Sequence, residues 1–265
     1  MRTILVFAVL VVILSVGTQV SAQTPTSVAK DPQAVAVLTQ SLNAAGGLVA
    51  VSGIQDFTAT GNVTYFWAAE QTQVPVTVRG MGISNFRIDA VLPTGTRTWA
   101  ASGYVGVLIN PDGTRRSSAF YNLMTAGSMT MPYVRIASVL TDSTTSITYV
   151  GSVSVNGQQA YQIHFVEGLD PSIATSSALL PGLGSFDLYI NPSSLLITEL
   201  IETVRSESNF NTTLTHEIDF ANYQTFGNTS MPCTIIEKIN GQETWSVAIS
   251  SVVFNSGLTI AEFNP

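Results

Sequence analysis

The chain has 265 residues, a formal net charge of −7 and only 10% charged side chains, against a usual level of about 25%. An acidic chain without Lys/Arg clusters is poorly suited to nucleic acid or to anionic membrane surfaces, because both attract basic patches. Cys233 is the only cysteine, which excludes an internal disulfide and predicts a buried structural thiol.

Residues 1–22 have the pattern of a signal peptide. Arg2 gives a basic start, Ile4–Val16 is an apolar run too short to span a bilayer, and Val20-Ser21-Ala22 provides small residues for cleavage. No stop-transfer pattern follows, which favours a signal peptide over an N-terminal membrane anchor. We expect a disordered polar leader over residues 23–29 and a single domain over residues 30–265. The sequence thus predicts a periplasmic or secreted protein without a stable transmembrane anchor.

Three segments carry helix signals. Asp31 is suited to the N-cap of a helix, Pro32 to its first position, and Gly46-Gly47 to its end. Pro132 opens a second, short helix. Asp170-Pro171 repeats the cap signature and begins either a short helix or an ordered loop.

Most of the remaining chain alternates between apolar and polar residues, which is the pattern of half-buried antiparallel strands. Asn156-Gly157 and Asn240-Gly241 are suited to the hairpin turns that such strands need. Pro75 indicates that its strand lies at an edge or carries a bulge. We expect about eleven strands, drawn from the stretches 57–67, 72–79, 86–92, 96–101, 104–109, 114–118, 146–151, 159–166, 186–190, 196–203, 214–220, 234–239 and 244–254.

A sheet of this size would be roughly 50 Å wide, because neighbouring strands lie about 4.8 Å apart. A helix with its side chains is only about 10–12 Å across, so the expected helices cover only part of one face. The predicted architecture is therefore mainly β, an incomplete (half) barrel with the N-terminal helix and the short inserted helices on its concave face. Either the protein's own side chains fill the hollow, or an apolar ligand occupies it.

Alternation assigns large apolar side chains to the concave face of this half-barrel. Methionines precede the second helix, where they either fill gaps in the core or form a gate for a ligand. We predict that a ligand binds in this hydrophobic cavity to Tyr65, Trp67, Phe86, Ile88, Trp99, Met129, Met131, Tyr133, Ile136, Tyr161, Phe165, Phe186, Leu188, Phe220 and Trp245.

Several stretches together resemble one known family. They are the helix at 31–47, the strands at 57–61 and 86–103, the hairpin Phe186–Pro192 (FDLYINP) with the strand at 196–203, and the ending Phe263-Asn264-Pro265. This layout resembles the LolA/LolB-like (outer-membrane lipoprotein carrier-like) periplasmic lipid-binding family, whose wider group includes mycobacterial lipid-binding lipoproteins and sigma-factor regulators. The resemblance implies that acyl chains are enclosed between the curved sheet and its helices. It departs at the arginine with which lipoprotein carriers hold their lid helices shut, since neither Arg87 nor Arg135 sits in a matching motif.

His164 and His216 are the only histidines, and we expect both to be neutral or exposed. Together with one cysteine they do not supply the ligands of a structural zinc site. The sequence contains no nucleophile elbow, phosphate loop or dinucleotide fingerprint. We therefore predict a protein that is not an enzyme and that uses no metal or cofactor.

Paired carboxylates would be the remaining route to catalysis, because a glycosidase needs two that face each other across one cleft. Glu199 and Glu202 are an odd number of residues apart in a strand, so they face opposite sides. Glu217 and Asp219 share a face opposite to Ile218, and we interpret that face as solvated. A hydrolase is therefore the least favoured hypothesis.

The leading hypothesis is an exported soluble carrier or sensor that binds a lipid, an acyl chain or another apolar ligand between the sheet and the helices. A lipoprotein or another envelope protein is a further candidate partner. The alternative is a protein-interaction or regulatory module of the same fold, whose hollow is filled by its own side chains. A continuous apolar void would favour the first hypothesis, and a packed interior would favour the second.

Overall fold

The structure, a computed structural model, describes residues 30–67, 70–123, 130–168 and 184–264. The predicted signal peptide and leader, Met129 and the segment that begins at Asp170 lie outside the described residues, as does the side chain of Trp67. Within the described part of the chain, no helix is long and apolar enough to cross a membrane.

Thirteen strands form one antiparallel sheet in the described residues, which is more than the predicted number because every stretch expected to be extended forms a strand of its own. The alternation in the sequence is therefore matched strand by strand. The strands are β1 (Asp56–Trp67), β2 (Glu70–Met81), β3 (Asn85–Leu92), β4 (Gly95–Ser102), β5 (Val105–Ile109), β6 (Arg115–Ser118), β7 (Ser146–Val155), β8 (Gln158–Val166), β9 (Ser185–Ile190), β10 (Ile197–Ser206), β11 (Asn209–Phe226), β12 (Thr229–Ile239) and β13 (Gln242–Phe254).

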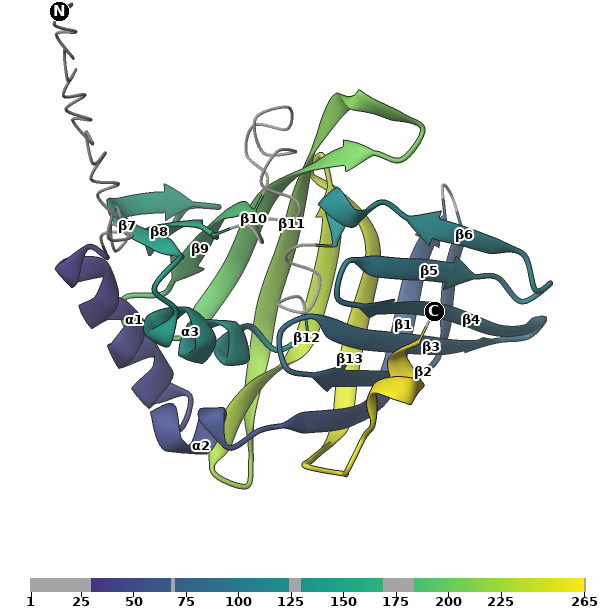
Figure 1. Ribbon diagram of the computed structural model, residues 1–265, viewed down its shortest axis with the longest axis horizontal. Helices are drawn as coiled ribbons and strands as arrows, with labels where there is room; N and C mark the ends of the chain where they lie inside the picture. The colour runs from purple at the N-terminus through teal and green to yellow at the C-terminus, as the bar shows by residue number, and fades with distance from the viewer. Residues whose placement is uncertain (1–29, 68–69, 124–129, 169–183, 265) are drawn as a thin grey trace, which may run out of the picture.

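The order of the strands is β6-β5-β4-β3-β2-β1-β13-β12-β11-β10-β9-β8-β7. Two runs of consecutive hairpins, β1 to β6 and β7 to β13, are thus joined by the pairing of the first strand with the last. The sheet curls but does not close, since β6 and β7 remain its two edges (Figure 1). The fold is the predicted half-barrel.

The seam between β1 and β13 contains a close backbone approach. The register shifts between Thr60 and Gly61, and a Cβ atom on Gly61 would lie only 2.0 Å from the carbonyl oxygen of Ala248. Only glycine fits at this position without movement of the neighbouring strand.

Pro75 lies where β2 is locally an edge, as the sequence predicts. It pairs with Asn62 of β1 on one side, but the pairing of β2 with β3 begins only at Val76. Because Pro75 is paired on one side only, its missing backbone N–H does not break a ladder that joins β2 to both of its neighbours.

In the part of the chain that the structure describes, three α-helices lie on the concave side of the sheet (Figure 1). They are α1 (Pro32–Ala44), α2 (Leu48–Ser52) and α3 (Pro132–Thr141), and short 3-10 helices occur at η1 (Phe120–Asn122) and η3 (Ile260–Phe263). The predicted caps are confirmed for α1, where Gln33 N donates to Asp31 Oδ1 at 2.8 Å and the helix ends before Gly46, whose φ is +120°. The sequence did not predict α2.

The residues just before α1 also pair with the free edge of β7. The backbone N–H of Asp31 donates to the carbonyl of Ile147 at 2.9 Å, and the N–H of Tyr149 donates to Asp31 Oδ2 at 3.1 Å. Lys30 Nζ donates to the carbonyls of Val139 and Leu140 at 2.6 and 2.9 Å, so the same segment ties α3 to this edge.

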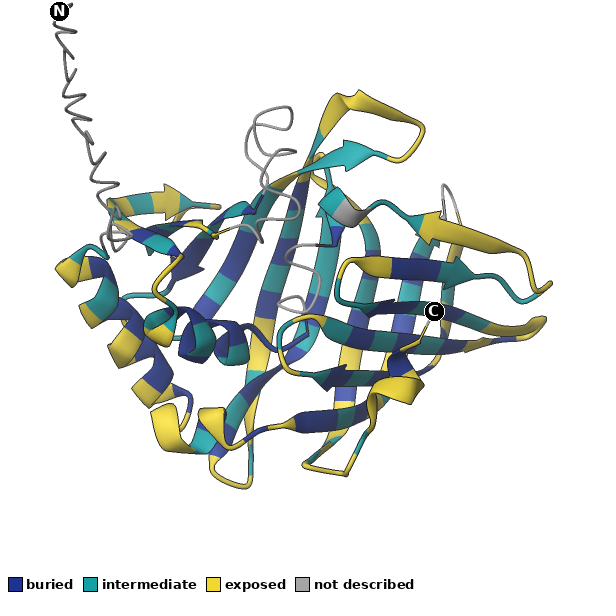
Figure 2. Cartoon of the chain, in the orientation of Figure 1, coloured by how far each residue is buried: buried dark blue, intermediate teal, exposed yellow. Residues whose placement is uncertain are grey.

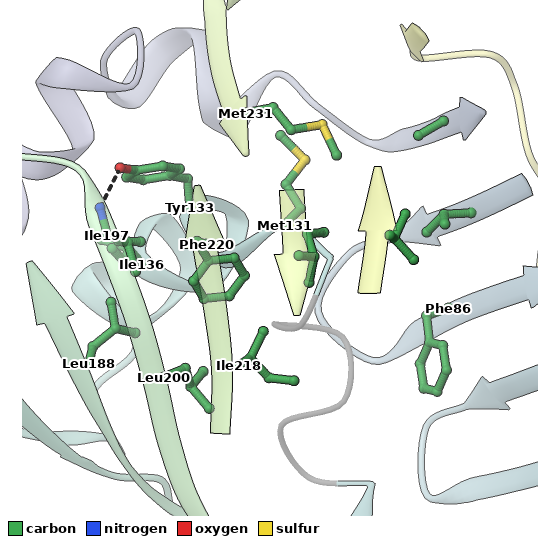
Figure 3. Packing of buried hydrophobic residues seen from close by; sticks show 14 of the residues in the cluster. Phe86, Met131, Tyr133, Ile136, Leu188, Ile197, Leu200, Ile218, Phe220 and Met231 are labelled. Atoms are coloured by element: carbon green, nitrogen blue, oxygen red, sulfur yellow. Dashed lines mark hydrogen bonds between the residues drawn. The ribbon is translucent and has the colours of Figure 1, made fainter. Parts of the chain in front are cut away.

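The buried core extends along the concave face over β1 to β4 and β8 to β13, and α1 and α3 pack over the part formed by β8 to β12 (Figure 3). Tyr133 of α3 is fully buried; its ring meets that of Tyr223 edge-on at 6.1 Å, and its hydroxyl accepts a bond from Ile197 N at 3.1 Å. The stacked rings of Phe165 and Phe186, 4.6 Å apart, lie in the same core. Cys233 is free and buried, which confirms the predicted structural thiol.

We expect the substitution Gly61→Ala to lower the free energy of unfolding by more than about 2 kcal/mol, because the added methyl group overlaps the backbone of β13. Urea denaturation followed by circular dichroism would measure the change. Asn62→Ala is the control, since this neighbouring side chain is exposed and its loss should change the stability by less than about 0.5 kcal/mol. Equal stabilities of the two variants would contradict the role given to the seam.

Candidate functional site

An open cleft of about 410 Å³ lies in the half of the barrel formed by β1, β3 to β6, β12 and β13. The helices pack over the other half of the concave face (Figures 1 and 2). The cleft is lined by Val63, Tyr65, Phe66, Ile88, Arg97, Trp99, Leu108, Arg116, Ser117, Ser118, Glu207, Glu237, Thr244, Trp245 and Val247.

Strand register explains why the floor of the cleft is aromatic and apolar. Tyr65 of β1 is directly opposite Trp245 of β13, and Trp245 is in turn opposite Glu237 of β12. On the other side, Ile88 of β3 is opposite Trp99 of β4. Directly opposed side chains on one face of an antiparallel sheet have Cβ atoms about 4.5–5.5 Å apart, so these side chains lie next to one another.

Charged groups also reach this cleft. The Arg97 guanidinium carbon lies 5.1 Å from the centroid of the Tyr65 ring. Burial raises the pKa of the Tyr65 hydroxyl, the positive charge of Arg97 opposes that rise, and the negative charge of Glu237 adds to it. The phenol therefore lies within the electrostatic reach of both a cation and an anion.

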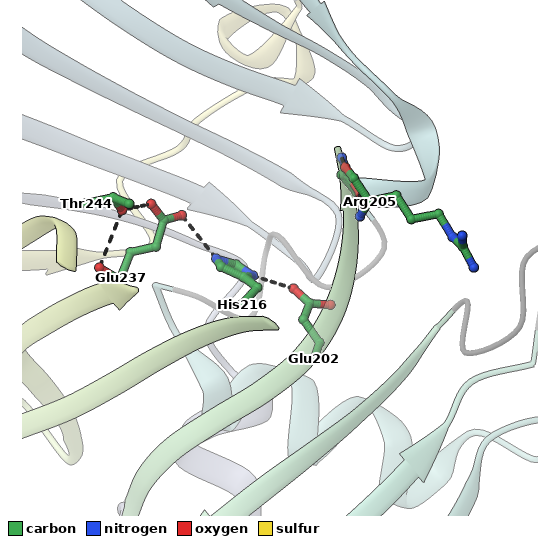
Figure 4. A network of polar contacts seen from close by, with 6 residues as sticks. Glu202, Arg205, His216, Glu237 and Thr244 are labelled. Atoms are coloured by element: carbon green, nitrogen blue, oxygen red, sulfur yellow. Dashed lines mark hydrogen bonds and ion pairs between the residues drawn. The ribbon is translucent and has the colours of Figure 1, made fainter. Parts of the chain in front are cut away.

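Behind Glu237 lies a buried chain of polar groups (Figure 4). His216 Nδ1 is 2.7 Å from Glu202 Oε1, and His216 Nε2 is 3.0 Å from Glu237 Oε1. The Thr244 hydroxyl donates to the other carboxylate oxygen of Glu237. The side chains of Glu202, His216 and Glu237 are only 8%, 8% and 13% exposed. We name these three residues the Glu-His-Glu cluster.

His216 is an imidazolium in this cluster. Burial by itself would lower the pKa of His216, but the hydrogen bonds and negative charges of Glu202 and Glu237 outweigh it and raise the pKa to about 10. Each ring nitrogen then donates to a carboxylate, which leaves no nitrogen lone pair to accept a proton. The cluster as a whole carries one negative charge.

The expectation for the two histidines is thus confirmed for one and wrong for the other. His164 is on the convex face with a side chain that is 39% exposed, and it pairs with Asp187 at 3.0 Å. His216 is buried and charged, because the pairing of β10 with β11 places Glu202 directly opposite it. The signal was present in the sequence: the alternation that puts Ile218 and Phe220 inside puts His216 inside as well.

The carboxylates of β10 and β11 lie on the faces of the sheet that the sequence predicts. Glu217 and Asp219 lie on the other face of β11 from the cluster, where both pair with Lys238. Glu199 lies near them and away from Glu202, and burial with the nearby negative charge of Asp219 raises its pKa to about 7. Among the described residues, no group of three histidine, cysteine or carboxylate side chains is placed to hold a metal ion.

The structure brings together only part of the predicted ligand-binding set. Four of its members, Tyr65, Ile88, Trp99 and Trp245, line the cleft. Tyr161 is half-buried beside Tyr149, while the Trp67 side chain and Met129 lie outside the described residues. The other eight are in the packed core beneath the helices or next to it: Phe86, Met131, Tyr133, Ile136, Phe165, Phe186, Leu188 and Phe220.

Arg135, which matches no family motif, is a buried charge on α3. Its guanidinium is 2.6 Å from Glu167 Oε1 just beyond the end of β8 and 5.9 Å from the centre of the Phe186 ring. Burial raises the pKa of Glu167 to about 7, although the positive charge of Arg135 opposes the rise. The pair links α3 to the sheet, and both residues line a second pocket of about 500 Å³.

Solved structures with the same arrangement exist. A domain described as an outer membrane lipoprotein-sorting protein from Vibrio parahaemolyticus has a TM-score of 0.53 and 11% identity, over 88% of this chain and 96% of that chain. A LolA superfamily protein from Nitrosomonas europaea has a TM-score of 0.52 and 11% identity, over 88% and 98% of the two chains. A DUF1329 family protein from Desulfovibrio piger has a TM-score of 0.53 and 10% identity, over 89% and 98%.

The described chain therefore has a LolA-like fold, as the resemblance in the sequence implies. No protein-family model and no curated protein matches the sequence. At identities this low the likeness concerns the fold alone.

The pKa of His216 predicts how stability depends on pH. The folded protein keeps this proton up to about pH 10, whereas an unfolded histidine loses it near pH 6.5. The stabilisation is therefore complete below about pH 6.5 and is lost as the pH rises through about 10, with a slope of up to about 1.4 kcal/mol per pH unit. Urea denaturation at pH 7, 8 and 9 would measure it.

Two variants separate His216 from the other titrating groups. His216→Gln should flatten the decline, whereas His164→Gln, the matched control on the convex face, should keep it. If the wild type and His216→Gln lost stability in parallel between pH 7 and 9, the imidazolium assignment would be wrong.

Proposed function

We propose that this protein is an exported carrier or sensor that binds a lipid, an acyl chain or another apolar ligand in the cleft formed by β1, β3 to β6, β12 and β13. The observation that carries the proposal is the cleft itself, because about 410 Å³ falls within the usual range of about 300–1,000 Å³ for small-molecule sites. Its lining includes the half-buried side chains of Leu108 and Trp99 and the buried side chain of Ile88. Covering such a surface with an apolar guest is favourable, at about 25 cal/mol per Å² of apolar area.

The proposed role is binding without chemistry. Both nitrogens of His216 are engaged by carboxylates, so this histidine does not fit a general base. Glu237, the carboxylate that lines the cleft, already accepts bonds from His216 and Thr244. The similarity in fold to a lipoprotein-sorting domain supports the hypothesis of a carrier. The predicted signal peptide supports a periplasmic or secreted location.

A direct test is to purify the chain without detergent and to examine it by native mass spectrometry and lipid extraction. We expect a co-purifying apolar molecule, or saturable uptake of a fluorescent fatty acid by the ligand-free protein. A chain that is always empty and never takes up the probe would contradict the proposal.

Filling the cleft should block binding. Leu108 of β5 lines the cleft, and Leu108→Trp adds bulk where the chain of a ligand would lie. We expect the affinity for the fluorescent fatty acid to fall at least about tenfold, or about 1.4 kcal/mol. Val105→Trp is the control, because Val105 lies on the same strand but is 62% exposed and does not line the cleft. Equal losses in the two variants would place the ligand elsewhere.

One observation favours the alternative, a protein-interaction or regulatory module. The half of the concave face beneath α1 and α3 is filled by the protein's own side chains, including Ile136, Leu188 and Phe220. Crosslinking in cells would favour this alternative if one defined envelope partner appeared while lipid uptake failed.

A further inference from the structure

The polar end of the cleft combines aromatic rings with a buried carboxylate. Along one rung of the sheet, Tyr65, Trp245 and Glu237 stand side by side on β1, β13 and β12. Trp99 and Phe66 line the same cleft. Aromatic faces attract cationic nitrogen, by about 0.5–1 kcal/mol at exposed sites and by about 2 or more where water is excluded.

The carboxylate of Glu237 belongs to the Glu-His-Glu cluster, in which the imidazolium of His216 lies between two carboxylates. A carboxylate that is shielded from bulk water attracts a cation more strongly than an exposed carboxylate does. Glu237 is the member that lines the cleft, and its carboxylate keeps acceptor positions beyond those used by His216 and Thr244.

The same cleft also carries positive groups. Arg97 and Arg116 line it, and Arg97 lies over the Tyr65 ring. Guanidinium groups suit a phosphate, because their planar N–H donors match its oxygens. Glu207 is the remaining charged group of the lining, so the lining contains two residues of each sign.

We propose that the ligand of this cleft is a zwitterionic amphiphile, whose cationic nitrogen lies against Glu237 and the aromatic rings and whose phosphate faces Arg97 and Arg116. The acyl chain lies along Ile88 and Leu108. This proposal rests on the proposed function, and it adds the chemistry of the head group that the cleft selects.

Three ligands with one acyl chain separate the head group from the chain. Lysophosphatidylcholine carries both charges, lysophosphatidylglycerol carries only the phosphate, and monoacylglycerol carries neither. Their Kd values for the wild-type protein are measured below the micelle concentration by intrinsic tryptophan fluorescence, to which Trp99 and Trp245 in the cleft contribute, with calorimetry as a second method. We expect lysophosphatidylcholine to bind about tenfold more tightly than lysophosphatidylglycerol, the ratio that about 1.4 kcal/mol gives.

Single substitutions identify the residues that select the head group. Glu237→Gln should remove most of the preference for lysophosphatidylcholine, measured as the ratio of its Kd to the Kd of lysophosphatidylglycerol. The matched control is Glu217→Gln on the convex face, which should keep the preference. Arg97→Gln should weaken the binding of both phosphate ligands several-fold more than it weakens the binding of monoacylglycerol. Circular dichroism checks that each variant is folded, and the comparison on the wild type stands even if one of them is not.

The results of this experiment distinguish a failure of the head-group selection from a failure of the proposed function. If the three ligands bind the wild type with equal affinity, the proposed head-group selection is overturned while the carrier function stands. The same holds if lysophosphatidylglycerol binds the wild type more tightly, or if the folded Glu237→Gln variant keeps the preference. If no ligand with an acyl chain binds at all, both the selection and the proposed function are wrong.

Discussion

The pairing of β1 with β13 is the contact on which the rest of the structure depends, because it converts two runs of hairpins into one curved surface. Each run alone is a simple meander with two free edges. Joined at Gly61 and Ala248, they share one concave face, on which both the packed core and the cleft are built. The rung that carries Tyr65, Trp245 and Glu237 crosses this seam, so the seam also builds the candidate site.

The helices cover only part of the concave face, which therefore has two parts with different properties. Beneath α1 and α3 the side chains interdigitate, and polar groups such as the Tyr133 hydroxyl find partners within the protein. Toward β3 to β6 the sheet curves further than the helices extend, and there the cleft remains. The buried imidazolium of His216 lies on the same face, where Glu202 and Glu237 from the two neighbouring strands hold it by hydrogen bonds.

Local patterns were enough to predict the strands, the capping of α1 by Asp31 and the half-barrel, because alternation and cap chemistry depend on neighbours in the sequence. The site was predicted less well. Alternation says that His216 points inward, but only the β10–β11 register decides that Glu202 stands opposite it. Likewise, whether Phe186 lines a void or a packed core depends on where α3 docks, which is set by tertiary contacts such as that of Arg135 with Glu167. Four of the predicted contact residues nevertheless line the cleft.

The two outer strands of the open sheet are protected from self-association by different means. A bare strand edge can recruit another chain and start aggregation. β6 is short and begins with Arg115 and Arg116, and such charges discourage partners. β7 is longer, and Lys30 and Asp31 occupy its backbone groups near Ile147 and Tyr149. A folding intermediate in which Lys30 and Asp31 have not yet docked onto β7 would expose that edge, so the residues that precede α1 also protect the protein from aggregation while it folds.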